Sequence, residues 1–238
     1  MFWQHIPEHL SPYILHTPWF SLHWYGLMYA VAYVVIYLLV RYRLAHERFS
    51  ITKDQVLGVM TWSIVGLAIG ARLFYVVFYE PGYYLAHPLD IVWPFGAGGE
   101  LKGISGLSYH GGLVGIIISI FLFCWKYKIR VWEVGDLFLP AIPLGYAFGR
   151  IGNFINGELF GRVTSVPWGM YFPRDASGML RHPSQLYESF LEGIVLFIIL
   201  WLVRKRVKGP KLLGLYLTAY AAARFLGCLL YTSDAADE

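Results

Sequence analysis

Six apolar stretches, each about as long as a membrane-spanning helix, take up most of the chain. An α-helix needs about 20 mainly apolar residues to cross the hydrocarbon core of a bilayer. Charged residues make up only 14% of the 238 residues, whereas a soluble domain carries about a quarter. We therefore expect an all-α, polytopic membrane helix bundle, with one integral membrane domain over residues 1–231. The predicted spans cover residues 22–40, 55–79, 109–125, 134–149, 184–203 and 212–231.

Basic residues are concentrated after the first, third and fifth apolar stretches. Residues 41–53 contain four Lys and Arg, residues 126–130 contain three and residues 204–211 contain five, which is 12 of the 19 in the chain. Cytoplasmic loops carry an excess of such residues, so we expect these loops inside and the N-terminus outside. The first 20 residues contain no Lys or Arg and so lack the basic segment of a cleavable signal peptide. Irregular loops on the outer side are expected to form a head.

Three arginines are predicted near the outer ends of the second, fourth and sixth spans: Arg72, Arg150 and Arg224. A charge at the centre of a membrane helix costs at least about 2.5 to 3.5 kcal/mol, so charged residues there are rare and usually functional. The guanidinium group stays charged, and its planar fork matches the oxygens of a phosphate. Three arginines at one depth therefore indicate a site for an anion, such as a phospholipid headgroup in the outer leaflet.

The alternative is that carboxylates simply neutralise the arginines inside the bundle. Gln185, Glu188 and Glu192 are spaced three and then four residues apart, which places them on one face of the fifth helix. Glu158 follows the fourth span. Paired charges within a membrane can serve packing as well as function, so charge placement alone leaves both interpretations open.

Two further residues lie at the predicted outer ends of spans, and each has a structural alternative. His110 precedes two glycines at the start of a helix, where a reactant could approach. A lone histidine is more often structural, and Tyr25 could equally anchor the first span among interfacial aromatic residues. Cys124 and Cys228 lie in apolar runs without metal-ligand spacing. The sequence contains no pattern typical of a metal site, a cofactor site or a nucleic-acid interface.

A segment directly after the fourth apolar stretch carries a family resemblance. Residues 149–162 read Gly-Arg-Ile-Gly-Asn-Phe-Ile-Asn-Gly-Glu-Leu-Phe-Gly-Arg and closely resemble the signature of bacterial prolipoprotein diacylglyceryl transferases. Other segments resemble further motifs of that family in the expected order: residues 23–26, 70–72, 110–113 and 181–188. The resemblance covers residues 20–226.

Members of this family transfer the diacylglyceryl group of phosphatidylglycerol to the lipobox cysteine of a prolipoprotein, forming a thioether and releasing glycerol 1-phosphate. The resemblance implies a multi-pass transferase of the bacterial inner membrane, with its active site toward the outer leaflet and with no cofactor and no metal. Its implied partners are phosphatidylglycerol, prolipoprotein signal peptides bearing a lipobox cysteine, and membrane lipid, but not nucleic acid. A thiol has a pKa of about 8.5, so a base that takes its proton helps to produce the thiolate that attacks the lipid. Arginines can stabilise the charge that develops on the leaving phosphate.

The resemblance also assigns roles to residues. Catalytic roles fall to four of them: His110, Arg150, Arg224 and Tyr25. Substrate-binding roles fall to six: Arg150, Asn153, Glu158, Gly161, Arg72 and Glu188. Arg150 and Arg224 would hold or stabilise the phosphate, His110 would be the candidate base, and the others would position the reactants. For Arg72, an ion pair with a carboxylate is an equally good expectation.

The chain departs from the family pattern near its C-terminus. The family has an acidic residue four positions after the arginine that corresponds to Arg224, followed by an outer segment and a seventh span. Here position 228 is Cys, and residues 232–238 read Thr-Ser-Asp-Ala-Ala-Asp-Glu, which suits neither a span nor a helix cap. We therefore expect six of the seven spans and a truncated or non-native tail over residues 232–238.

Two other functions are compatible with outer arginines and broken helices. One is a transporter for a small anion or lipid, although the inverted repeats that such a protein would have are not visible in the sequence. The other is a lipid-binding remnant that holds phosphatidylglycerol without modifying a cysteine. Formation of a covalent product distinguishes the enzyme from both.

Overall fold

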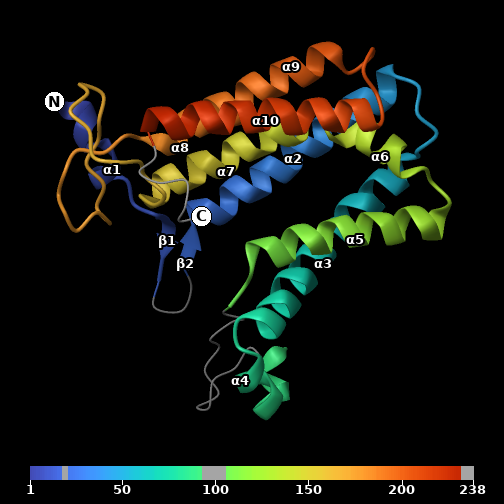
Figure 1. The fold of residues 1–238 in the computed structure, drawn as a ribbon, viewed down its shortest axis with the longest axis horizontal. Helices are drawn as coiled ribbons and strands as arrows, with labels where there is room; N and C mark the ends of the chain where they lie inside the picture. The colour runs from blue at the N-terminus through green and yellow to red at the C-terminus, as the bar shows by residue number, and fades with distance from the viewer. Residues whose placement is uncertain (18–20, 93–105, 232–238) are drawn as a thin grey trace. The chain divides into compact units, whose positions relative to one another are not determined.

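The computed structural model describes residues 1–17, 21–92 and 106–231, with side chains up to residue 228. The described residues of 1–49 and 135–238 form one compact unit, and those of 50–134 form the other (Figure 1). The predicted tail over residues 232–238 and part of the predicted outer loop, with Lys102, lie outside the described residues. Helices make up most of the described chain, which agrees with the predicted class.

Four helical stretches are long and apolar enough to cross a membrane: Trp24–His46, Lys53–Phe78, Tyr109–Tyr127 and Ser184–Val203. They correspond to the first, second, third and fifth predicted spans. The full count of six spans and the orientation of the chain stay predictions.

The N-terminal segment is more regular than the loops expected there. A 3-10 helix η1 (Phe2–His5) leads into α1 (Ile6–His9), and β1 (Tyr13–His16) pairs with β2 (Ser21–His23) in an antiparallel hairpin. The rings of Tyr13 and His23, which are opposite each other in this hairpin, lie 4.6 Å apart. Such cross-strand ring contacts stabilise a pair of strands.

The first span, α2 (Trp24–His46), packs against α7 (Ile142–Asn156), and the two run side by side in Figure 1. Small residues of α7 allow the close approach, because a Cβ atom at Gly145 would lie 2.5 Å from the Ile36 side chain. The predicted fourth span is broken, as its prolines suggest: α6 (Val131–Phe138) ends before Pro140, and α7 begins with Pro143 in its first turn. However, α7 continues past the predicted end at residue 149, so the signature lies largely within the helix.

The fifth span contains a π-helical segment. It consists of α8 (Ser184–Glu188), the π-helix η3 (Ser189–Val195) and α9 (Leu196–Val203), and the last helix, α10 (Pro210–Tyr231), follows. The segment approaches α7 closely at Ala147, where Ser189 Oγ donates a 3.1 Å hydrogen bond to the carbonyl oxygen. A Cβ atom at Gly193 would lie 2.9 Å from the Ala147 Cα atom, so a larger residue would force the helices apart.

A buried ion-pair cluster ties α2 to the turn after α9, at the end of the spans that we predict to be cytoplasmic. Arg43 is fully buried and lies 2.7 Å from Glu47, which also lies 2.8 Å from Arg204. Burial raises the pKa of the Glu47 carboxyl, but hydrogen bonds from Arg43 and Arg204 outweigh it and hold this pKa below its usual range. At least two residues of the predicted basic loops therefore have structural partners.

The second unit is built on α3 (Lys53–Phe78) and α5 (Tyr109–Tyr127), with α4 (Pro81–Ala86) and the 3-10 helix η2 (Pro88–Ile91) between them in the chain. Glycines bring the two long helices into backbone contact. A Cβ atom at Gly115 would lie 2.9 Å from the Gly70 Cα atom, whereas one at Gly112 would come no closer than 3.5 Å to a neighbouring atom. This is the close approach that small residues permit in membrane helices.

We predict that Gly115→Ala destabilises the second unit, because the added methyl meets backbone atoms that cannot rotate away. Such overpacking costs about 1–3 kcal/mol, so the midpoint of thermal unfolding in detergent should fall. Gly112→Ala is the matched control on the same helix and should leave the midpoint near that of the wild type. Equal midpoints for the two variants would contradict this close backbone contact between α3 and α5.

Candidate functional site

Five polar side chains in the first unit form a closed ring of hydrogen bonds and ion pairs. They come from three segments that are distant in the sequence, and we call them the Arg–Glu ring. Its members are Tyr146 and Arg150 of α7, Glu188 of α8, Glu192 of η3 and Arg224 of α10. The ring contains two of the three arginines predicted to bind an anion.

The distances around the ring show how it closes. Arg150 Nε lies 2.8 Å from Glu188 Oε2 and donates a 2.7 Å hydrogen bond to the Tyr146 hydroxyl. That hydroxyl in turn donates to Glu192 Oε2 at 2.7 Å. Arg224 Nη1 lies 3.0 Å from Glu188 Oε1 and 3.8 Å from Glu192 Oε1. The Tyr146 hydroxyl also lies 3.4 Å from Glu188 Oε2, so each glutamate faces a positive charge and a hydroxyl.

Burial differs between the acidic and the basic members. Glu188 and Glu192 are only 4% and 1% exposed, whereas the side chains of Arg150 and Arg224 are 16% and 26% exposed. Removing one partner of a buried pair costs several kcal/mol, about 3–5, because the other charge is left uncompensated. The glutamates are thus the buried members of the ring, and the arginines are its more exposed members.

Arg150 donates its hydrogen bond to Tyr146 through Nε, and the same atom makes its 2.8 Å contact with Glu188. Its guanidinium group also lies over the Tyr146 ring, 5.1 Å from the centroid. A guanidinium group carries five N–H donors, so the two terminal nitrogens of Arg150 retain the paired donors that bind a phosphate or carboxylate in a fork.

A second set of polar contacts holds the segment that follows Arg150. Asn153 Nδ2 and Asn156 Nδ2 donate to Glu158 Oε1 at 3.0 and 3.2 Å, and Arg174 lies 3.0 Å from Glu158 Oε2. Gln185, which is fully buried, donates from Nε2 to the Glu158 carbonyl oxygen at 2.6 Å. Asn153 and Glu158 were both expected at the site, and these contacts join them to the fifth span.

The turn after α7 depends on an unusual backbone conformation. Gly157 has a φ of 65° and ends the helix in the left-handed region, and Leu159 shares that region with a φ of 57°. This region is rare for a residue with a side chain and marks a conformation imposed by its surroundings. Gly161 follows, and its N–H donates to the His182 carbonyl oxygen at 2.9 Å. The signature is thus folded back onto the start of α8.

Tyr25 lies at the first turn of α2, beside the signature helix. A Cβ atom at Gly152 would lie 3.2 Å from its ring, so the aromatic ring packs over this glycine. Its hydroxyl shares a 2.9 Å hydrogen bond with that of Tyr29 one turn later. This placement agrees with a positioning role, although an interfacial anchor would have the same contacts.

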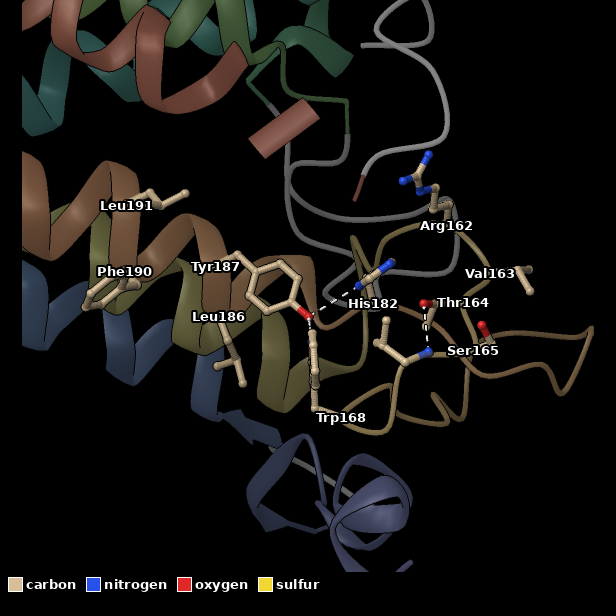
Figure 2. A pocket seen from close by; sticks show the side chains of 11 residues that line it. Arg162, Val163, Thr164, Ser165, Trp168, His182, Leu186, Tyr187, Phe190 and Leu191 are labelled. Atoms are coloured by element: carbon tan, nitrogen blue, oxygen red, sulfur yellow. Dashed lines mark hydrogen bonds between the residues drawn. The ribbon is translucent and has the colours of Figure 1, made fainter. Parts of the chain in front are cut away.

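A cavity of about 870 Å³ lies along the other side of α8, between the helix and the loop that follows the signature (Figure 2). The fifth span contributes Leu186 and Tyr187 from α8 and Phe190 and Leu191 from η3, and the loop contributes the polar groups of Arg162, Thr164 and Ser165. An apolar wall with a polar rim suits an amphipathic molecule.

Tyr187 links the two sides of this cavity. Its hydroxyl accepts a 2.7 Å hydrogen bond from Trp168 Nε1 and lies 3.3 Å from His182 Nδ1 (Figure 2). Burial and the nearby charge of Arg162 hold the pKa of His182 below its usual range. At neutral pH the histidine is therefore mainly uncharged.

Arg72 and His110 both belong to the second unit. Arg72 donates to the carbonyl oxygens of Asp90 and Ile91 at 2.6 and 2.8 Å, and its guanidinium group lies over the Tyr84 ring. It thus stabilises the segment after α3. His110 is exposed in the first turn of α5, where Ser108 caps the helix.

Tyr146 is the member of the ring that sequence reasoning missed. A tyrosine in an apolar stretch is normally interpreted as a packing residue. Its spacing of four residues before Arg150 was the available signal, because residues four apart lie on one face of a helix. Within the described residues, no group of three or more His, Cys, Asp and Glu side chains is arranged to hold a metal ion.

Known proteins resemble the chain over nearly its whole length. A family model described as prolipoprotein diacylglyceryl transferase matches residues 12–234. Curated relatives carry the name phosphatidylglycerol–prolipoprotein diacylglyceryl transferase. The protein from Chlorobaculum tepidum is 48% identical over 94% of this chain and 78% of its own length. Those from Wolinella succinogenes and Campylobacter jejuni are 45% and 44% identical, over 95% and 97% of this chain and 82% and 84% of their own lengths. This chain therefore belongs to the prolipoprotein diacylglyceryl transferase family and is a transferase.

Proposed function

We propose that this chain transfers the diacylglyceryl group of phosphatidylglycerol to the lipobox cysteine of a prolipoprotein signal peptide, with the Arg–Glu ring as the phosphate site. The names of its relatives support the two substrates. The observation that carries the phosphate site is Arg150, whose Nε contacts Tyr146 at 2.7 Å and Glu188 at 2.8 Å while its side chain stays 16% exposed.

The reaction explains why arginines are needed. The thiolate sulfur attacks the glycerol carbon that carries the phosphate, a C–S bond forms, and the C–O bond to phosphate breaks. The bonding electrons stay on the phosphate oxygen, so glycerol 1-phosphate gains negative charge as it leaves. Donors that are already oriented toward such a developing charge stabilise the transition state more than the ground state. Arg150 and Arg224 fill this role.

The carboxylates of the ring orient these arginines. Glu188 contacts both, one through each carboxylate oxygen, and so fixes their separation. Asn153, Glu158 and Gly161 hold the turn that follows the signature helix, and Tyr25 packs against that helix. We assign these residues to positioning the substrates, with the site toward the outer leaflet and the basic loops in the cytoplasm.

The thiol needs a base, and His110 is our candidate. A thiol with a pKa of about 8.5 is only a few per cent ionised at neutral pH, so removal of its proton increases the attacking thiolate. His110 is exposed at the start of α5, and Arg72 supports the neighbouring segment of the same unit.

The first prediction concerns the fork of Arg150. Arg150→Lys keeps a positive charge beside Glu188 but replaces the paired donors with a point charge. We expect the rate of diacylglyceryl transfer to a lipobox peptide, measured with phosphatidylglycerol liposomes, to fall at least about tenfold. Arg41→Gln, which removes an arginine outside the ring, is the control and should retain transfer. Wild-type rates in Arg150→Lys would exclude Arg150 as the phosphate ligand.

The second prediction concerns the base. His110→Ala should slow transfer about 100-fold near neutral pH. The deficit should shrink as the pH rises from about 7 to about 9, because the thiol then ionises without help. His87→Ala, which removes an exposed histidine from the same unit, is the control. A deficit that stays constant over this pH range would show that His110 is not the base.

A further inference from the structure

We infer that Tyr146 is a positioning residue of the transfer reaction, whose hydroxyl holds Arg150 by Nε so that both terminal nitrogens face the phosphate. This inference rests on the proposed function and deepens it. The hydroxyl accepts from Arg150 at 2.7 Å and donates to Glu192 at 2.7 Å, so its single proton and one lone pair are both used.

The contacts of Arg150 differ from the usual arrangement of an arginine with a carboxylate. Arginine and carboxylate groups frequently pair in a fork, through two parallel hydrogen bonds. Here Arg150 Nε lies 2.8 Å from Oε2 of Glu188, and Oε1 of the same carboxylate lies 3.0 Å from Arg224. Tyr146 shares the same Nε atom. The Tyr146 hydroxyl and Arg224 together therefore prevent Arg150 from forming a two-point contact with the Glu188 carboxylate.

The backbone around Tyr146 fixes this geometry. The next residue, Ala147, is the point at which α7 touches η3, through the hydrogen bond from Ser189 and the close approach of Gly193. Glu192 immediately precedes Gly193, so the contact that brings the helices together also brings Glu192 to the hydroxyl. The Tyr146 ring additionally meets the Tyr220 ring edge to face, with centroids 6.2 Å apart. Its side chain is thus held from several sides.

Without the hydroxyl, Arg150 loses the acceptor on one side of Nε. The guanidinium group can then rotate toward a two-point contact with Glu188, and this rotation withdraws its terminal nitrogens from the phosphate. Binding of phosphatidylglycerol changes little, because Arg224 and the lipid chains still contribute. The stabilisation of the leaving phosphate falls, so kcat carries the effect rather than KM.

The test is the Tyr146→Phe variant, assayed with phosphatidylglycerol liposomes and a lipobox peptide. We expect kcat to fall at least about tenfold, with KM for phosphatidylglycerol within about threefold of the wild type. Tyr33→Phe removes the hydroxyl of another partly buried span tyrosine and should leave both constants unchanged. If the wild type transfers the group and Tyr146→Phe has an unchanged kcat, the inference about Tyr146 is overturned but the proposed function is not. Absence of transfer by the wild type would overturn the proposed function as well.

A purely structural role for the hydroxyl requires a second comparison. Tyr146→Phe leaves the buried Glu192 carboxylate without its donor, which alone could destabilise the fold. Glu192→Gln removes that charge, so the double variant is compared with Glu192→Gln instead of the wild type. We expect the thermal midpoint of the double variant Tyr146→Phe, Glu192→Gln to rise above that of Tyr146→Phe. Its kcat should stay at least about tenfold below that of Glu192→Gln. Equal kcat values for these two proteins would show that the hydroxyl only compensates Glu192.

Discussion

The site depends on the mutual neutralisation of two arginines and two glutamates among apolar helices. Neither kind of charge is tolerated alone in such surroundings, because desolvation costs several kcal/mol for each ion. The Arg–Glu ring solves this problem by giving each carboxylate oxygen of Glu188 its own arginine. The solution links three segments that are far apart in the sequence, so the same contacts that make the charges tolerable also assemble α7, α8 and α10.

The ring in turn depends on how closely two helices approach. Gly193 and Ala147 let η3 lie against α7, and the wider π-helical turn accommodates this contact within the fifth span. Such turns occur frequently at functional sites. A regular helix with a larger residue at 193 would hold Glu192 away from Tyr146. The close packing of small residues in the backbone therefore determines where the charged side chains of the ring are placed.

The sequence predicts the apolar helices and the polar face of the fifth span well, because helix periodicity and the cost of burying charge both act locally. The spacing of Gln185, Glu188 and Glu192 predicted one shared face, and all three are buried. The short hairpin of β1 and β2, the extension of α7 through Asn156 and the π-helix were not predicted, since each depends on tertiary contacts. Tyr146 was missed for the same reason: only the partners of its hydroxyl distinguish it from a packing residue.

The balance of charge in the Arg–Glu ring has a consequence for turnover. A cluster of unpaired arginines would bind a phosphate tightly and bind the more negative glycerol phosphate more tightly still, so that product release would limit the rate. Two arginines matched by two glutamates carry no net charge, and they can attract an anion only through the orientation of their donors. Such a site favours the geometry of the transition state over the total charge of the ligand. We therefore expect product inhibition to be weak.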